Sequence, residues 1–217
     1  AIATAHIDDR KQVQNCLRKI TLSSKHLLGL INDVLDMSKI ESGKLTLTTE
    51  QISLKEVVEG IVNIMQPQVK AKRQTFDIHV ENILTENVWC DGVRLNQVLL
   101  NLLSNATKYT PESGSIQLSL SEEKSPKGDN YVRIHIKVKD NGIGMSPDFL
   151  KKIYESYSRA DGARIHKTEG AGLGMAITKY IVEAMEGSLN ITSELDKGTE
   201  VSLTFDFEKA VALEMDM

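Results

Sequence analysis

The sequence predicts an α+β fold, a two-layer α/β sandwich with a mostly antiparallel sheet, preceded by one long helix. Three observations lead to this fold class. Residues from about 8 to 40 repeat apolar side chains every seven positions. Further along, several segments alternate apolar and polar residues, as strands with one buried face do. Other segments carry the i, i+3, i+4, i+7 apolar spacing of helices that pack on a sheet.

The long helix is expected to begin near Asp8 and Asp9, since negative charge is favoured at a helix start, and to end at Gly43. Its apolar stripe has two seams, widened by Leu17 and Ile31: Val13, Ile20, Leu27 and Val34 form one, and Cys16, Ser23, Leu30 and Met37 form the other. One helix cannot bury such a stripe alone, so a partner helix is expected.

The elements of the sandwich follow Gly43. The expected strands are residues 44–50, 75–81, 87–91, 115–123, 131–140, 188–194 and 199–208, and the expected helices are residues 53–71, 91–109 and 173–187. Residues 141–172 are polar and punctuated by glycines. A connection of that length in a compact domain favours a lid or binding loop.

Composition excludes several classes of function. The formal net charge of −4 argues against a nucleic-acid surface, which would be basic. No apolar run is long enough to span a membrane, and no secretory leader pattern is present, so we expect no membrane contact by this segment. Cys16 and Cys90 fit no metal spacing and are interpreted as reduced, buried thiols. The start "AIATAHIDDRK" leads us to expect a piece of a longer protein.

Asn101, Asn105 and Lys108 share one face of the expected helix 91–109, opposite the apolar residues that would face the sheet. Amide oxygens can ligate Mg²⁺, and a lysine can meet a phosphate as a point charge. The alternative is an ordinary solvated flank of a helix.

Two glycine-rich stretches are the other candidate binding elements. In "VKDNGIGM" a strand runs into Asp140, whose carboxylate could accept a hydrogen bond from an exocyclic amine, and Gly142 and Gly144 permit close backbone approach. In "EGAGLGMAI" three glycines precede a helix, where exposed N–H groups can bind an anion. The alternatives are ordinary turns, and neither stretch is a dinucleotide fingerprint or a P-loop.

Taken in order, these stretches resemble the catalytic core of bacterial sensor histidine kinases, within the GHKL ATP-binding superfamily and its Bergerat fold. "NQVLLNLLSNATKYTPESG" resembles the N box, "VKDNGIGM" the G1 box, "IYESYSRA" the F box, "EGAGLGMAI" the G2 box and "KGT" a G3 element. The long helix, ending "HLLGLINDVLDMSKIESGKL", resembles the second helix of the dimerisation and phosphoacceptor hairpin.

The resemblance implies ATP and Mg²⁺ as ligands, and a role for each matching residue. Asn105 would ligate Mg²⁺, and Asn101 would lie near the γ-phosphate. Lys108 and Tyr109 would contact phosphate and nucleotide, and Arg159 would stabilise charge during transfer. The remaining implied contacts are to adenine, from Asp140, Gly142, Ile143, Gly144, Met145 and Thr199, and to the phosphates beneath a lid, from Gly170, Ala171, Gly172, Leu173 and Gly174.

The resemblance also implies an organisation and partners. Residues 1–43 would be the second helix, with a stub of the first, of the dimerisation domain, residues 44–210 the ATP-binding domain, and residues 211–217 a tail. The whole protein would dimerise through the long helix, phosphorylate a response-regulator receiver domain, and keep this portion in the cytoplasm of a bacterium, anchored to the membrane elsewhere.

Three features depart from the family pattern. Tyr154 and Tyr157 stand where phenylalanines are usual, and Ala171 replaces a frequent Ser or Thr. No motif of the form His-Glu/Asp-x-x-x-Pro is present, so we expect the acceptor histidine to lie upstream of this segment.

Alternative functions remain within and beyond this fold. Gyrase-type topoisomerases, mismatch-repair ATPases and heat-shock chaperones carry a glutamate as general base where this chain has Asn101. A neutral amide cannot accept the proton, which favours phosphotransfer over hydrolysis. A degenerate nucleotide-binding module and a coiled-coil interaction fragment are the other readings.

Overall fold

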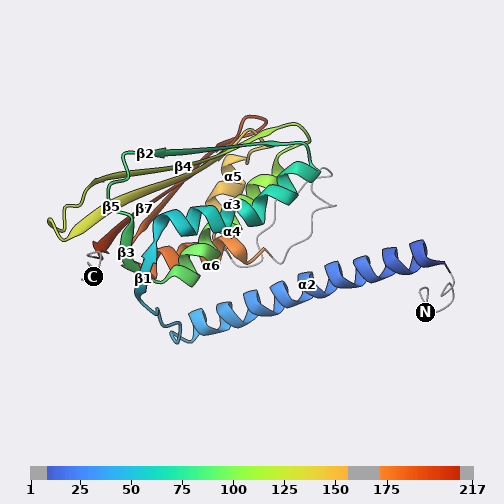
Figure 1. The fold of residues 1–217 in the computed structure, drawn as a ribbon, viewed down its shortest axis with the longest axis horizontal. Helices are drawn as coiled ribbons and strands as arrows, with labels where there is room; N and C mark the ends of the chain where they lie inside the picture. The colour runs from blue at the N-terminus through green and yellow to red at the C-terminus, as the bar shows by residue number, and fades with distance from the viewer. Residues whose placement is uncertain (1–8, 156–171, 211–217) are drawn as a thin grey trace, which may run out of the picture.

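The computed structural model describes residues 9–155 and 172–210, and it has the predicted architecture of a long helix followed by a two-layer sandwich (Figure 1). The helices are α2 (Arg10–Glu41), α3 (Leu54–Ala71), α4 (Gly92–Tyr109), α5 (Pro147–Lys152) and α6 (Gly174–Ala184). The strands are β1 (Glu50–Ser53), β2 (Thr75–Glu81), β3 (Asn87–Cys90), β4 (Ser115–Lys124), β5 (Tyr131–Asp140), β6 (Ser188–Glu194) and β7 (Gly198–Lys209).

The described strands form one seven-stranded sheet with the order β1-β3-β7-β5-β4-β2, and β6 also pairs with β7. β5 is central, antiparallel to both β4 and β7. β6 and the short β3 share the other edge of β7, since β6 pairs with residues 198–204 and β3 with residues 208–209. Only β2 and β4 run parallel, so the sheet is mixed but mostly antiparallel, as predicted.

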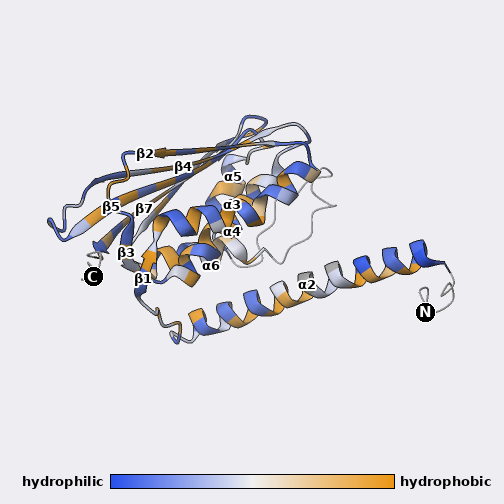
Figure 2. Ribbon diagram, in the orientation of Figure 1, coloured by the Kyte–Doolittle hydropathy of each residue, from blue (hydrophilic) through white to orange (hydrophobic). Residues whose placement is uncertain are grey.

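The core lies between the sheet and helices α3, α4 and α6, which cover one of its faces (Figure 1). Along residues 116–120 of β4, 132–138 of β5 and 201–207 of β7, every second residue is buried against these helices, while the intervening residues are polar. The apolar and polar stripes are visible on the helices in Figure 2. On α4 the predicted face is buried: Leu95, Val98, Leu99, Leu102, Leu103 and Ala106.

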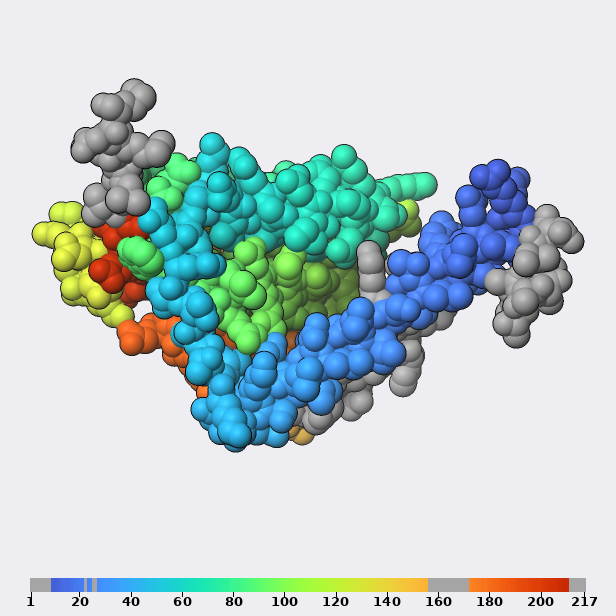
Figure 3. Space-filling model, turned by 60° about the horizontal axis from the view of Figure 1, so that its bottom comes forward, coloured from blue at the N-terminus to red at the C-terminus, as the bar shows by residue number. Residues whose placement is uncertain are grey.

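Helix α2 is capped at its start by Asp9, whose side chain accepts hydrogen bonds from the Lys11 and Gln12 N–H groups. It ends before Gly43, which has φ +63°, a conformation that suits glycine. Its docking face near the C-terminal end comprises Asp33, Asp36, Met37 and Ile40, and here it lies against α6 and α4 (Figure 3).

A buried carboxylate is central to this docking. Asp36 Oδ2 accepts hydrogen bonds from Arg94 Nη1 at 3.0 Å and from Gln97 Nε2 at 2.8 Å, both on α4. Burial, and then the charge of Asp36, raise the pKa of the neighbouring Asp33. Much of the apolar stripe of α2 is exposed in the single chain, which is what the sequence pattern predicts for a helix that packs against a partner helix. The exposed residues are Leu17, Ile20, Leu27, Ile31 and Val34.

Two predictions about local structure were wrong. Residues 44–49 form no strand, and β1 begins only at Glu50. The alternation there reflects half-burial of Leu45 and Leu47, whereas the Thr48 N–H donates to the Asp91 side chain at 2.9 Å rather than to a neighbouring strand. Within 141–172, residues Pro147–Lys152 form the short helix α5, capped by Ser146.

Both ends of α4 are capped by side chains. At its start, Asp91 Oδ1 accepts a hydrogen bond from the Arg94 N–H at 3.0 Å. At its end, Lys72 Nζ donates to the carbonyls of Thr107, Lys108 and Thr110 at 2.6, 3.0 and 3.0 Å. The Gln74 amide donates to the Thr107, Thr110 and Pro111 carbonyls. Burial lowers the pKa of Lys72.

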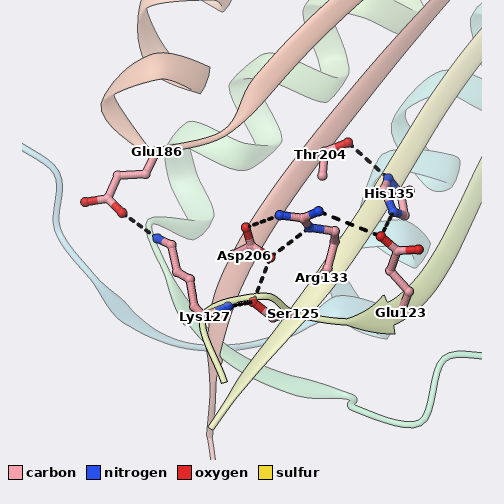
Figure 4. Close-up of polar contacts among 8 residues, drawn as sticks. All are labelled: Glu123, Ser125, Lys127, Arg133, His135, Glu186, Thr204 and Asp206. Carbon is pink, nitrogen blue, oxygen red and sulfur yellow. Dashed lines mark hydrogen bonds and ion pairs between the residues drawn. The ribbon is translucent and has the colours of Figure 1, made fainter. Parts of the chain in front are cut away.

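The outer face of the sheet is polar and cross-linked along β4, β5 and β7 (Figure 4). Arg133 makes a two-pronged contact with Asp206, at 2.9 and 2.8 Å, and Ser125 donates to the same carboxylate at 2.8 Å. His135 lies between Glu123 and Thr204, 2.9 Å from the former and 3.0 Å from the latter. The face of the sheet opposite the helices is therefore covered by paired polar side chains, which suits contact with water.

Two composition-based expectations can be compared with the described residues. None of the helices in the described ranges has both the length and the apolar character needed to cross a membrane. Cys16 and Cys90 are free thiols, but only Cys90 is buried, whereas Cys16 is half-exposed on α2. Burial, with Asp91 and Glu50 nearby, raises the pKa of Cys90 to about 12, so that this thiol stays protonated.

Replacing Lys72 tests the capping of α4. We expect Lys72→Met to lower the free energy of unfolding by about 1–3 kcal/mol, because three carbonyls lose a charged donor near the negative end of the helix dipole. Urea denaturation measures the change. Lys70→Met, at an exposed position two residues earlier, is the control and should stay within about 0.5 kcal/mol of wild type. Equal stability of the two variants would contradict the capping role.

Candidate functional site

The polar face of α4 is present as predicted. Asn101, Asn105, Lys108 and Tyr109 are all half-buried, on the flank that does not pack into the core. Lys108 Nζ lies 5.0 Å from the centre of the Tyr109 ring, close enough for a cation–π contact. The helix therefore presents two amides and an ammonium along its last three turns.

Asn101 is held by helix α6. Its Nδ2 donates a hydrogen bond to Thr178 Oγ1 at 2.8 Å and lies 3.9 Å from Met175 Sδ. Its Oδ1 lies against Gly174, where an added Cβ would collide with it. The amide is thus enclosed by the first turns of α6, whereas the sequence pattern had indicated only that it shares a face with Asn105.

Asp140 lies at the end of the central strand, with Ile116 of β4 on one side and Thr199 of β7 on the other. Its Oδ1 accepts a hydrogen bond from the Gly142 N–H at 2.8 Å. Burial raises the pKa of Asp140, and the backbone hydrogen bonds from Gly142 and Thr199 lower it in part. The result is a desolvated carboxylate whose orientation is fixed by the backbone.

The loop after Asp140 is attached to the end of α4. The Ile143 N–H donates to the Tyr109 carbonyl at 3.2 Å, and a Cβ on Gly142 would lie 2.6 Å from the same oxygen. Close backbone contact therefore requires glycine at 142. The glycine therefore has a structural reason within the chain itself, and its contact with a base, which the family resemblance implies, stays a prediction.

The same loop is attached to the turn between β6 and β7. The Asp196 N–H donates to the Ile143 carbonyl at 2.8 Å. Gly144 has φ +61°, and a side chain there would collide with the Glu194 carbonyl. Ile143 and Met145 are half-buried beside these contacts. Two separate elements thus hold the segment 142–145 in place.

Thr199 completes the surroundings of Asp140. Its hydroxyl lies 2.9 Å from Ser193 Oγ, which also donates to the Gly198 carbonyl at 2.9 Å. Gly198 has φ +105°, and a Cβ there would collide with the Asp140 carbonyl. The predicted G3 element therefore packs directly onto the strand end that carries the carboxylate.

Part of the predicted site lies outside the described residues, namely Tyr157, Arg159, Gly170 and Ala171. The described remainder of the glycine-rich stretch leads into α6: Gly172 has φ +73°, and Leu173 is fully buried ahead of the first turn. Tyr154, from the F box, is half-buried, with Lys179 Nζ 4.8 Å from its ring centre.

The donor types fit Mg²⁺ with ATP. In the described ranges, no three His, Cys, Asp or Glu side chains gather into a metal-binding group. Mg²⁺ is commonly held by few protein oxygens together with substrate phosphates, and an asparagine amide suits that arrangement. A half-buried carboxylate with a fixed acceptor geometry, Asp140, suits an exocyclic amine.

Sequence patterns missed the residues that support the site. Thr178, Lys72, Gln74 and Asp36 were not singled out, although each contacts α4. Their contacts join positions 33 to 77 residues apart along the chain, and no local spacing signals such pairs. For Thr178 alone there is a sequence signal, because its spacing from the apolar Ile181 and Val182 puts it on the buried face of α6.

The chain also resembles known proteins. Residues 90–209 match the family model for the histidine kinase-, DNA gyrase B- and HSP90-like ATPases. The chain is 37% identical to the autoinducer 2 sensor kinase/phosphatase LuxQ of Vibrio vulnificus, over 86% of this chain and 22% of that protein. It is 34% identical to the sensory/regulatory protein RpfC of Xanthomonas campestris, over 98% and 28% respectively. For the sensor histidine kinase GacS of Pseudomonas protegens the identity is 32%, over 89% and 21%. The chain thus spans between a fifth and three-tenths of these relatives.

Solved structures have the same fold. Full-length ShkA in complex with AMPPNP superposes with a TM-score of 0.74 and 29% identity, over 92% of this chain and 40% of that one. The Acinetobacter baumannii histidine kinase AdeS superposes with a TM-score of 0.65 and 20% identity, over 91% and 84%, which supports the fold alone.

The raised pKa of the half-buried Asp140 carboxylate predicts a pH dependence of stability. Because the pKa of Asp140 is higher in the folded than in the unfolded chain, the folded state binds the proton more tightly. The contribution of this group to stability is therefore greatest at acidic pH and falls as pH rises through the folded-state pKa. Chemical denaturation from pH 4 to 7 should show Asp140→Asn gaining stability relative to wild type as pH rises. Asp129→Asn, at an exposed site, is the control and should follow wild type; a parallel response of both variants would refute the effect of burial.

Proposed function

The chain belongs to the family of histidine kinase-, DNA gyrase B- and HSP90-like ATPases, as the catalytic core of a sensor histidine kinase, and on this premise we propose that it binds ATP with Mg²⁺ and transfers the γ-phosphate to a protein histidine. In the same proposal, the phosphohistidine then passes its phosphate to an aspartate of a response-regulator receiver domain. The names of the curated relatives, which include sensor kinases, support this direction.

The observation that carries the proposal is the position of Asp140. This carboxylate is desolvated, held by the Gly142 and Thr199 N–H groups, and joined through the 142–145 loop to the end of α4. An adenine amine donating to it would place the rest of a nucleotide toward the polar face of α4. The AMPPNP complex of ShkA, an adenine nucleotide analogue on a similar fold, supports the same ligand class.

Along α4, each polar side chain has a task in this proposal. The Asn105 amide oxygen would hold Mg²⁺, which neutralises charge on the phosphates when bound. Lys108 and Tyr109 would contact phosphate and nucleotide. Asn101, one turn before Asn105, would lie near the γ-phosphate, and Arg159 would stabilise charge during transfer.

The remaining proposed contacts divide between base and phosphates. Close approach of the base would be allowed along the 142–145 segment, where Ile143 and Met145 give half-buried apolar surface, and at Thr199. The phosphates would be covered by residues 170–174.

Phosphotransfer is favoured over hydrolysis by the residue at position 101. A dedicated ATPase needs a base to take a proton from water, and an amide cannot do so. Positioning and charge stabilisation are enough for transfer of a phosphoryl group to a nucleophile that is already basic, such as a neutral imidazole. Asn101 therefore supports a protein side chain, rather than water, as acceptor.

The division of the chain and its partners are also part of the proposal. Residues 1–43 would belong to a dimerisation helix, in line with the end of α2 at Glu41, and residues 44–210 to the ATP-binding domain, with 211–217 as a tail. The exposed stripe of α2 would pair two copies in the full protein. Attachment of that protein to a membrane, with this portion in the cytoplasm, is the arrangement that we propose.

Loss of the Asp140 carboxylate tests the adenine contact. We expect Asp140→Ala to weaken binding of ATP with Mg²⁺ by about a hundredfold or more, because a buried amine would lose its acceptor. Isothermal titration calorimetry measures this, with Asp129→Ala as the matched exposed control. Unchanged affinity in Asp140→Ala, with the fold intact by circular dichroism, would refute the assignment.

Steady-state turnover tests the reaction type. With ATP and Mg²⁺ but no acceptor, release of inorganic phosphate should stay well below about 1 s⁻¹, the low end of ordinary enzyme turnover. With radiolabelled ATP and a fragment that carries an acceptor histidine, acid-labile phosphohistidine should form. Rapid phosphate release by the chain alone would support the ATPase reading instead, and binding without either reaction would support a degenerate nucleotide-binding module.

A further inference from the structure

Asn101 contacts Thr178 of α6, a residue that lies outside the motifs that predicted the site. The Asn101 amide is enclosed by three residues of the first turns of α6, with Thr178 as its hydrogen-bond acceptor at 2.8 Å. Thr178 is only 1% exposed. A side chain that buried is rarely an incidental partner, because an unmatched polar group there would be costly.

The three α6 residues restrict the amide in different ways. Thr178 fixes the direction of the Nδ2 group, and Met175 lies beside it. Gly174 leaves room for Oδ1, which any side chain at that position would displace. Gly174 and Thr178 are four residues apart, so they lie on the same face of α6, one turn from each other.

This contact connects the two parts of the proposed phosphate site. Asn101 lies one turn before Asn105 on α4, and α6 follows directly on Gly172 and the fully buried Leu173. A shift of α6 along α4 would break the Asn101–Thr178 hydrogen bond. The bond therefore sets the register between the helix that carries the amides and the glycine stretch that leads into α6.

We propose that Thr178 is a positioning residue that acts through Asn101, and that this pair fixes α6 relative to α4 so that ATP with Mg²⁺ meets a preformed phosphate site. The inference rests on the proposed function for its ligand, but not for the contact itself. Asn101 then has a structural task in the free protein, in addition to its place near the γ-phosphate.

A matched pair of variants tests the role of the hydroxyl. Thr178→Val keeps the shape of the side chain and removes the acceptor, whereas Thr178→Ser keeps the acceptor. In the nucleotide-free chain, we expect backbone amides of residues 174–181 to exchange with deuterium about tenfold faster in Thr178→Val, with wild-type rates in Thr178→Ser. Exchange in β4 and β5 should be unchanged in both, since the sheet core does not depend on this contact.

Nucleotide binding supplies the second readout. Affinity for ATP with Mg²⁺ should fall about tenfold in Thr178→Val and recover in Thr178→Ser, as the loss of one buried hydrogen bond would produce. Affinity for ADP in EDTA, which lacks both the γ-phosphate and the metal, should change by less than about twofold. A merely structural effect of the valine would weaken both ligands alike, and would contradict a positioning role.

A double-mutant cycle with Asn101→Ala completes the test. If the two residues act as a pair, Asn101→Ala with Thr178→Val should exchange no faster at residues 174–181 than the worse single variant. Additive effects, or wild-type exchange and affinity in Thr178→Val, would overturn the inference. If the wild-type chain fails to bind ATP with Mg²⁺, the proposed function fails, while the exchange data still decide whether the pair fixes α6.

Discussion

The last four carbonyl groups of a helix have no partners within it, and the way α4 satisfies them determines the geometry of the candidate site. The Thr110 N–H donates to the Ala106 carbonyl, and Lys72 and Gln74 donate to the carbonyls of residues 107 and 108 and of residues 110 and 111 just beyond the helix. The Ile143 N–H donates to the Tyr109 carbonyl. The hydrogen bonds from Lys72 and Gln74 fix where the helix ends. The hydrogen bond from Ile143 positions the loop that follows Asp140. The positions of the Asp140 carboxylate and of the α4 amides are therefore both set by the C-terminal end of α4.

The fold was predictable where a pattern repeats along the chain. Strands β4, β5 and β7 alternate because one face of each is buried, and the seven-residue repeat of α2 extends over its whole length. The prediction failed at residues 44–49, where the same alternation comes from half-burial without a pairing strand. Alternation reports which side chains are covered, but pairing also needs a free strand edge, and that depends on topology.

The candidate site was predictable only as a set of local stretches. The order of the amide, glycine and aspartate motifs led to the family, and the structure brings Asp140, the 142–145 loop and Thr199 together. The reasons for the glycines could not be read from the sequence, since Gly142, Gly144 and Gly198 each face a backbone carbonyl from another element. Likewise, Thr178 and Lys72 contact α4 across long sequence separations, which leave no periodic signal.

The docking of α2 has a mechanical consequence. The helix is attached near its C-terminal end, where Asp36 is bonded to α4, and the stretch from there back to Arg10 is about 39 Å long at 1.5 Å per residue. The Asp36–Arg94 ion pair is therefore the point about which a tilt of the helix would be measured. A tilt of about 10° at that point would carry the far end through roughly 7 Å, which exceeds the rise of one helical turn. A small rearrangement of two side chains on α4 would thus become a large displacement at the other end of the arm.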